Sequence, residues 1–153
     1  MTVTTNLEIV KYPNEILRQV SKTIENNDKE AIETLLNMKK YVQNEENYAM
    51  GLALPQVGVS KRGFVAELQG KVEVVINPKI LMKNGTSYDT EGCLSVEEQN
   101  DGIVPRSKEI MVIYKDHNMK VKKKVLKGLS ARVFQHELDH LDGILYMDRI
   151  KEE

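Results

Sequence analysis

Two stretches of the chain place apolar residues at helical spacing. Between residues 28 and 42, apolar side chains recur every three or four positions, and Asp28 stands where an N-cap would accept a backbone N–H, the apolar set being Ile32, Leu35, Leu36 and Val42. A second helix is predicted for residues 130–141, which contain no Gly or Pro. Ser130 is its expected N-cap, and Gly143 is the expected signal that ends it.

Shorter apolar runs separated by turn residues predict strands. The expected strands are residues 63–68, 72–77, 110–114 and 120–126. Gln69-Gly70 predicts a tight turn between the first two strands, and residues 116–118 are expected to join the last two. The lysines at positions 122–124 indicate an edge strand protected against aggregation, in preference to an RNA-binding surface.

Length and composition predict one globular domain spanning residues 1–153. A chain of 153 residues with 41% hydrophobic content can bury roughly two-thirds of its unfolded surface. The net charge of −1 gives no argument for nucleic acid or an anionic membrane as a partner. The single cysteine excludes an internal disulfide and favours a reducing compartment. Because residues 1–10 lack the features of a signal peptide, we expect a cytoplasmic protein. We also expect it to be a monomer.

The strongest chemical signal lies in residues 135–140, Gln-His-Glu-Leu-Asp-His. His136 and His140 are four positions apart, so a helix places both rings on one face, where they can reach the same metal ion. Glu137 between them can accept a proton from a water that the metal activates. The competing interpretation is an exposed, charged helix face. However, two of only three histidines in the chain fall in this pattern.

A metal site needs at least one further protein ligand, and little follows His140 that could supply it. One group of zinc peptidases continues the pattern to a third histidine, but the corresponding residue here is Tyr146. A later glutamate could come only from residues 152–153. Cys93, upstream and the sole cysteine, is therefore the predicted third ligand. If His117 were a fourth ligand, the site would be closed, as in structural zinc centres. The expected position of His117 in a turn disfavours this arrangement.

Three motifs resemble those of the peptide deformylases. Residues 91–95 match that family's E-G-C-L-S, and residues 135–143 match its Q-H-E-x-D-H-L-x-G. Residues 49–56 resemble its G-x-G-x-A-A-x-Q, with Ala49 for the first glycine and Leu54 for the second alanine. The resemblance covers nearly the whole chain, because shorter signatures follow in the family's order at residues 12–13, 17–18, 76–78, 104–106 and 148–150.

The resemblance implies a metal-dependent hydrolase that removes the formyl group from the N-terminal formylmethionine of newly made polypeptides. It implies Cys93, His136 and His140 as ligands of one divalent ion, usually Fe²⁺, with Zn²⁺ or Ni²⁺ as alternatives, because this ligand set suits several metals. It also implies an α+β fold, with mixed or antiparallel strands around the helix that carries both histidines. The helix at residues 28–42 is expected to pack outside.

Further roles follow from the same resemblance. Glu137 is the expected general base, while the Gln56 amide and the Leu94 backbone N–H are expected to stabilise the oxyanion. Glu91 and Arg106 resemble a pair that braces the cysteine loop, and solvated surface side chains are the alternative. Residues expected beside the bound peptide are Met50, Gly51, Gly92 and Val133.

Two other functions stay open at this stage. Ala49 and Leu54 add bulk near the expected substrate site, which is compatible with a metal-binding relative that has little or no turnover. A metallopeptidase that cuts internal bonds is the other possibility, and it would need a groove open on both sides. The chain also ends soon after residues 148–150, without the C-terminal helix implicated in ribosome docking in some relatives. We therefore expect no strong ribosome docking.

Overall fold

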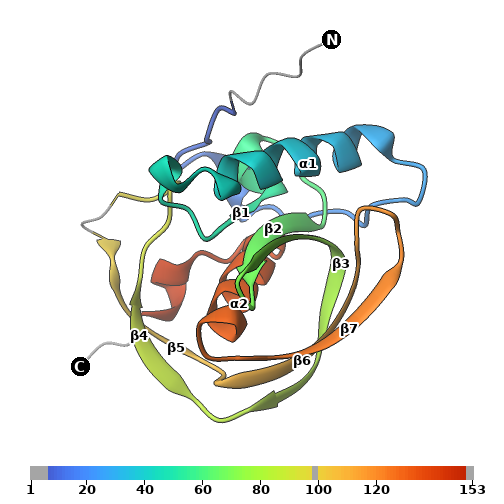
Figure 1. Ribbon diagram of the computed structural model, residues 1–153. Coiled ribbons are helices and arrows are strands. Elements are labelled where there is room, and N and C mark those ends of the chain that lie inside the picture. Colours follow the sequence, from blue (N-terminus) through green and yellow to red (C-terminus); the bar gives the residue numbers. More distant parts are fainter. Residues whose placement is uncertain (1–6, 98–99, 151–153) are drawn as a thin grey trace.

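A five-stranded antiparallel sheet curves around one helix, α2, while the other, α1, lies on the opposite face of the sheet (Figure 1). The computed structural model describes residues 7–97 and 100–150. In spatial order the strands are β1 (Gly51–Ala53), β2 (Gly63–Leu68), β3 (Lys71–Asn84), β6 (Glu109–Lys115) and β7 (Val121–Lys127). A separate antiparallel pair is formed by β4 (Ser87–Glu91) and β5 (Gly102–Arg106). The predicted α+β class is confirmed.

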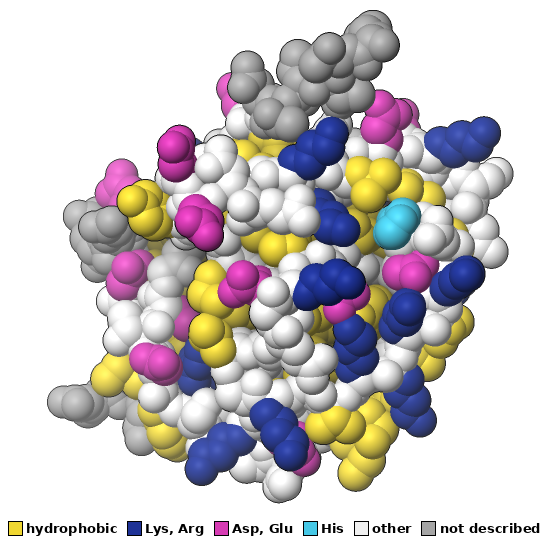
Figure 2. Space-filling view, viewed as in Figure 1, with side chains coloured by type: hydrophobic (Ala, Val, Ile, Leu, Met, Phe, Trp, Pro, Cys, Tyr) yellow, Lys and Arg dark blue, Asp and Glu magenta, His cyan; other side chains and the backbone are white. Residues whose placement is uncertain are grey.

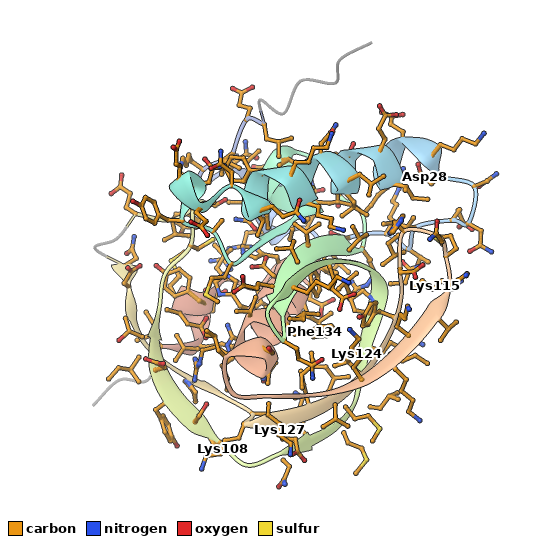
Figure 3. The ribbon with its side chains drawn as sticks, in the orientation of Figure 1. Asp28, Lys108, Lys115, Lys124, Lys127 and Phe134 are labelled. Atoms are coloured by element: carbon orange, nitrogen blue, oxygen red, sulfur yellow. The ribbon has the colours of Figure 1, made fainter. Side chains whose placement is uncertain are left out.

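Both faces of the sheet are buried at β2. Phe64 and Ala66 face α2 (Gly128–Leu141), while Val65 between them faces α1 (Lys29–Gln43), because successive side chains of a strand point to opposite sides. Phe134 of α2 meets Phe64 edge-on at 5.1 Å between ring centroids, and it lies inside the curve of the sheet in Figure 3. The sheet thus separates two apolar layers.

Helix α2 is buried on most sides, and its ends differ in how well the sequence predicted them. The expected N-cap is wrong, because the helix already begins at Gly128 and the Ser130 hydroxyl accepts the Gln69 backbone N–H at 2.8 Å. Its end is as expected, since Gly143 follows with a φ of +74°. A Cβ at Gly143 would lie 2.3 Å from the Arg18 carbonyl oxygen, so only glycine fits.

Short 3-10 helices connect the main elements. They are Glu15–Arg18, Glu45–Asn47, Leu54–Val57 and Tyr146–Arg149. The last of these packs Tyr146, with Leu17 and Val104, into a third apolar cluster beside β5. Within the described ranges 7–97 and 100–150, no helix is long and apolar enough to cross a membrane.

Strand β7 is at the edge of the sheet, as the lysines predicted. Lys122 and Lys123 are exposed, and Figure 2 shows several Lys and Arg side chains on the side where β6 and β7 lie. Lys124 differs from this interpretation. It pairs in register with Val112 on the inner face, is half-buried and forms an ion pair with Glu73. Lys124 therefore forms a half-buried ion pair inside the curved sheet and does not protect its edge.

The start of α1 provides a test of stability. Asp28 pairs with Lys61 and accepts the Ala31 N–H at 3.1 Å. Both bonds lower the pKa of the Asp28 carboxyl, and the bond from Lys61 has the larger effect. Because the pKa is lower in the folded state, the stabilisation is complete above about pH 4 and is lost as the pH falls through the folded-state pKa. We expect Asp28→Ala to lower the free energy of unfolding by about 1 kcal/mol at pH 7, and by less in acid, in denaturant titrations.

The matched control is Asp28→Asn. Asparagine can still cap the helix but cannot form the ion pair, so its loss should be smaller. Equal losses for the two variants at pH 7 would show that capping contributes nothing.

Candidate metal centre

Three potential ligand atoms converge at the histidine pair of α2. One atom each from Cys93, His136 and His140 lies within 4.8 Å of the others, and Cys93 Sγ is 3.4 Å from His140 Nε2. A tetrahedral zinc site, with metal–sulfur and metal–nitrogen bonds of about 2.3 and 2.0 Å, separates its ligand atoms by about 3.3–3.5 Å. The 3.4 Å between Cys93 Sγ and His140 Nε2 matches this spacing, and a thiol with two imidazoles suits a divalent transition metal.

Cys93 stands in a tight turn just after β4. Its carbonyl accepts the Val96 N–H at 3.1 Å, closing the turn. The N-terminal segment holds the same turn from outside, because Tyr12 N–H donates to the Ser95 carbonyl at 2.8 Å and Lys11 Nζ to the Leu94 carbonyl at 2.6 Å. The turn thus presents the thiol to α2.

Glu91 and Arg106 form a buried pair, so the surface alternative for these residues is wrong. Arg106 Nε and Nη2 each donate to the Glu91 carboxylate at 2.9 Å, and the residues are 5% and 8% exposed. Glu91 Oε1 also accepts from His136 Nδ1 at 2.8 Å. Burial alone would raise the Glu91 pKa, but the bonds from Arg106 and His136 outweigh it and hold that pKa well below its usual range. An ionised Glu91 leaves His136 Nε2 as the nitrogen available to a metal.

Sequence reasoning missed Arg132, which binds the same carboxylate. Its Nη1 donates to Glu91 Oε2 at 2.6 Å and to the Val104 carbonyl at 2.9 Å. Its Nη2 donates to the Ser87 carbonyl at 3.0 Å. The available signal was its position four residues before His136, which places both side chains on one face of a helix.

Glu137 is buried against the backbone of β1. A Cβ at Gly51 would lie only 2.6 Å from Glu137 Oε2, so the missing side chain makes room for the carboxylate. Glu137 Oε1 has no hydrogen-bond partner within residues 7–97 and 100–150. Burial raises the Glu137 pKa to about 7, against the opposing charge of His136. A carboxylate with this pKa can accept a proton near neutral pH.

The two imidazoles differ in protonation. Burial lowers the His140 pKa well below its usual value, helped by the charge of His136, so that ring is neutral. Burial opposes the charge on His136 too, but its bonds to Cys93 and Glu91 raise its pKa to about 10. A bound cation would displace this proton, as metal ligation requires a free ring nitrogen.

Gln56 is buried, and both its amide oxygen and its amide nitrogen have partners, as expected for a polar group in an apolar run. Its Oε1 accepts the Ala53 N–H at 2.9 Å, while Nε2 is 3.2 Å from Ser95 Oγ and 3.4 Å from Cys93 Sγ. The amide donor therefore points at the ligand cluster.

The centre opens into a cleft of about 420 Å³. Of the ten candidate site residues, nine line this cleft and His140 does not. The nine are Met50, Gly51, Gln56, Gly92, Cys93, Leu94, Val133, His136 and Glu137. Ala49 also lines the cleft, whereas Leu54 is fully buried in the apolar cluster that packs on α1. A separate hollow of about 480 Å³ lies beside Gln135 and Asp139 and contains none of the three ligands.

The other ligand candidates do not join the cluster. His117 is exposed and is not part of the ligand group. The glutamates at 152–153 lie outside the described residues. The three candidate ligands brought together in the described part of the chain thus resemble an open site, which leaves room for a water or substrate.

Comparisons with known proteins agree in sequence and in structure. Residues 6–153 match the family model described as polypeptide deformylase. The peptide deformylase of Nautilia profundicola is 40% identical over 152 residues, covering 94% of this chain and 86% of that protein. That of Dictyoglomus thermophilum is also 40% identical over 152 residues, covering 95% and 94%. The crystal structure of the Thermotoga maritima peptide deformylase superposes with a TM-score of 0.88 at 37% identity, covering 95% of this chain and 98% of that one.

Metal content tests the ligand cluster. We expect the protein to retain about one equivalent of Zn²⁺ after dialysis, and Cys93→Ala to retain far less, because two imidazoles alone bind weakly. His117→Ala is the matched control and should keep the full amount. Near-stoichiometric metal in Cys93→Ala, by elemental analysis, would show that the third ligand is another residue.

Proposed function

The chain belongs to the polypeptide deformylase family, and from that premise we propose that its cleft binds the N-terminal formylmethionine of new polypeptides. The proposed reaction is hydrolysis of the formyl group, carried out by the described residues as one domain. The observation that carries this proposal is the convergence of Cys93, His136 and His140 beside the buried Glu137. The products are formate and a polypeptide with a free N-terminal amine.

Cys93, His136 and His140 would hold the divalent ion. When bound, the ion supplies Lewis acidity and lowers the pKa of a water molecule in the site. We favour iron, as the family resemblance implies, with zinc or nickel as alternatives for the same ligands. An iron–thiolate centre open to solvent is sensitive to oxidation, which favours a reducing compartment such as the cytoplasm.

Glu137 is the proposed general base. Its carboxylate would accept a proton from the attacking water and later deliver it to the departing amine. Burial supports this role, since a pKa of about 7 allows the group both to take and to release a proton near neutral pH. Its Oε1 supports it further, because this oxygen accepts no hydrogen bond from the described residues and keeps its lone pairs for a proton.

Two donors are proposed for the oxyanion that forms on the formyl carbon. They are the Gln56 side-chain amide and the Leu94 backbone N–H. The bond from the Ala53 N–H fixes the Gln56 oxygen, which commits Nε2 to the side facing Cys93. A donor that is already fixed stabilises the developing charge without reorganising during the reaction.

The peptide is expected to lie along β1. This strand ends the sheet order, so its outer edge can pair with an extended chain, beginning with the backbone of Met50 and Gly51. Val133 and Met50 offer an apolar wall for the methionine side chain, and Gly92 lines the same cleft.

Neither alternative function gains support. The hypothesis that this protein binds metal but has little turnover depended on the bulk of Ala49 and Leu54. Leu54, however, is buried on the α1 side of the sheet and does not line the cleft. The two relatives and the one solved structure reported above are all named peptide deformylase, so they lend nothing to a peptidase that cuts internal bonds.

The direct test compares formylated and acetylated substrates. Protein reconstituted anaerobically with Fe²⁺ should release formate from an N-formyl-Met peptide and leave the N-acetyl analogue nearly intact, because the extra methyl obstructs attack. Glu137→Gln should retain metal and lose about 10² to 10⁴ in kcat through loss of the base. A metal-loaded unmutated protein that is no faster than Glu137→Gln would refute the proposed function.

Gly51 provides a steric test of the base. Alanine at this position would push the Glu137 carboxylate away, since the added Cβ would approach Oε2 to 2.6 Å. A displacement on the order of 1 Å lowers rates by about 10². We therefore expect Gly51→Ala to lose about 10² in kcat/KM while its metal content and thermal unfolding stay near those of the unmutated protein. Full activity in this variant would show that catalysis does not depend on the position of the carboxylate.

A further inference from the structure

We propose that Arg132 is a positioning residue for His136, acting through Glu91, and that it helps to retain the metal. The inference deepens the proposed function and rests on its metal centre. Arg132 lies on α2, lines the cleft and is 7% exposed, so its charge is held inside the protein.

The geometry of the Glu91 carboxylate is the first argument. Oε1 accepts from His136 Nδ1 and from Arg106, while Oε2 accepts from Arg106 and from Arg132. Each oxygen thus accepts two bonds, and the shortest of the four, at 2.6 Å, comes from Arg132. Charge-assisted bonds of this length are among the stronger hydrogen bonds in proteins.

The arrangement along α2 is the second argument. Arg132 precedes His136 by four residues and contacts Glu91 directly. Asp139 follows His136 by three residues and reaches Glu91 through Arg106, whose Nη1 donates to Asp139 Oδ2 at 2.6 Å. The helix therefore holds the carboxylate from one turn before the ligand and from one turn after it. Removing Arg132 would leave only the second of these connections.

The other contacts of Arg132 are the third argument. Its guanidinium also donates to the Ser87 and Val104 carbonyls, so one side chain joins α2 to both strands of the β4–β5 pair. Glu91 is the last residue of β4, two positions before Cys93. Arg132 therefore constrains the element that carries the third ligand as well as the acceptor for His136.

Within the described residues, the His136 ring also contacts Cys93 and meets the His140 ring edge-on at 5.1 Å between centroids. Its Nδ1 is fixed by Glu91, and one face stacks on Tyr146 at 6.0 Å between centroids with an interplanar angle of 17°. Stacking restrains the plane of the ring but still permits a flip about the Cβ–Cγ bond, which would exchange Nδ1 with Cδ2 and Nε2 with Cε1. The bond to Glu91 is then what directs Nε2 toward His140 and Cys93, and Arg132 acts on that bond.

The experiment measures the rate at which Co²⁺- or Zn²⁺-loaded protein loses its metal to a chelator. Partners that orient metal ligands typically contribute 10- to 100-fold to metal affinity. We expect Arg132→Met to lose metal about tenfold faster than the unmutated protein. Arg132 makes a single bond to Glu91, so Arg132→Lys, which keeps one charged donor for that carboxylate, should stay within about threefold. The visible absorption bands of the Co²⁺ protein should shift in Arg132→Met, because the direction of an imidazole ligand changes.

Ser87→Ala is the matched control. It removes only the hydroxyl that accepts from Arg132 Nη2 at 3.1 Å and keeps the Ser87 carbonyl as an acceptor, so it should leave the metal loss rate and the Co²⁺ spectrum unchanged. Thermal unfolding of the metal-free proteins separates a structural effect from a positioning effect. If Arg132→Met does not fold, Arg132→Gln is measured in its place. Glutamine can still donate to the Val104 carbonyl, but it presents no positive charge to the Glu91 carboxylate.

The outcomes distinguish this inference from the proposed function. If the unmutated protein holds no metal that depends on Cys93, the proposed metal centre fails. If it holds metal, but the folded Arg132 variant loses it at the unmutated rate with an unchanged Co²⁺ spectrum, the role of Arg132 as a positioning residue is overturned. Equal metal loss from Arg132→Lys and Arg132→Met would overturn it as well.

Discussion

The burial of one ionised carboxylate, that of Glu91, is the constraint on which the site depends. A buried charge is stable only when it is paired and fully hydrogen-bonded. Here the pairing requires Arg106 from β5 and Arg132 and His136 from α2, so satisfying Glu91 brings three elements together. The cysteine turn follows Glu91 directly. The position of Cys93 relative to the histidines therefore depends on how this charge is compensated, together with the bonds that Tyr12 and Lys11 make to the turn.

The enclosure of α2 supplies the second half of the site. Because the sheet curves around the helix, Glu137 is withdrawn from water, and its pKa rises to about 7. The same burial keeps His140 neutral and ready to ligate. Gly51 completes the arrangement, since β1 approaches the helix so closely that a side chain there would meet the Glu137 carboxylate. Packing and chemistry are set by the same contacts.

The sequence predicted correctly those features that depend only on neighbouring residues. The predicted strand at residues 63–68 has the observed bounds, and Asp28 caps α1 as expected. Features decided by distant contacts were missed. The β4–β5 pair was not predicted because its first strand, Ser-Tyr-Asp-Thr-Glu, is polar and shows no apolar alternation. Ser130 carries a capping signature, but it serves the Gln69 turn instead, and Arg132 was missed because its acceptor, Glu91, is 41 residues away in the sequence.

The central claim is that one sulfur and two imidazole nitrogens hold a single metal ion with a position left open. X-ray absorption spectroscopy on the zinc-loaded protein tests it most directly. The account predicts one sulfur scatterer at about 2.3 Å and two imidazole nitrogens at about 2.0–2.1 Å, together with one light, non-imidazole atom. A first coordination sphere without sulfur, or with a third imidazole, would contradict it.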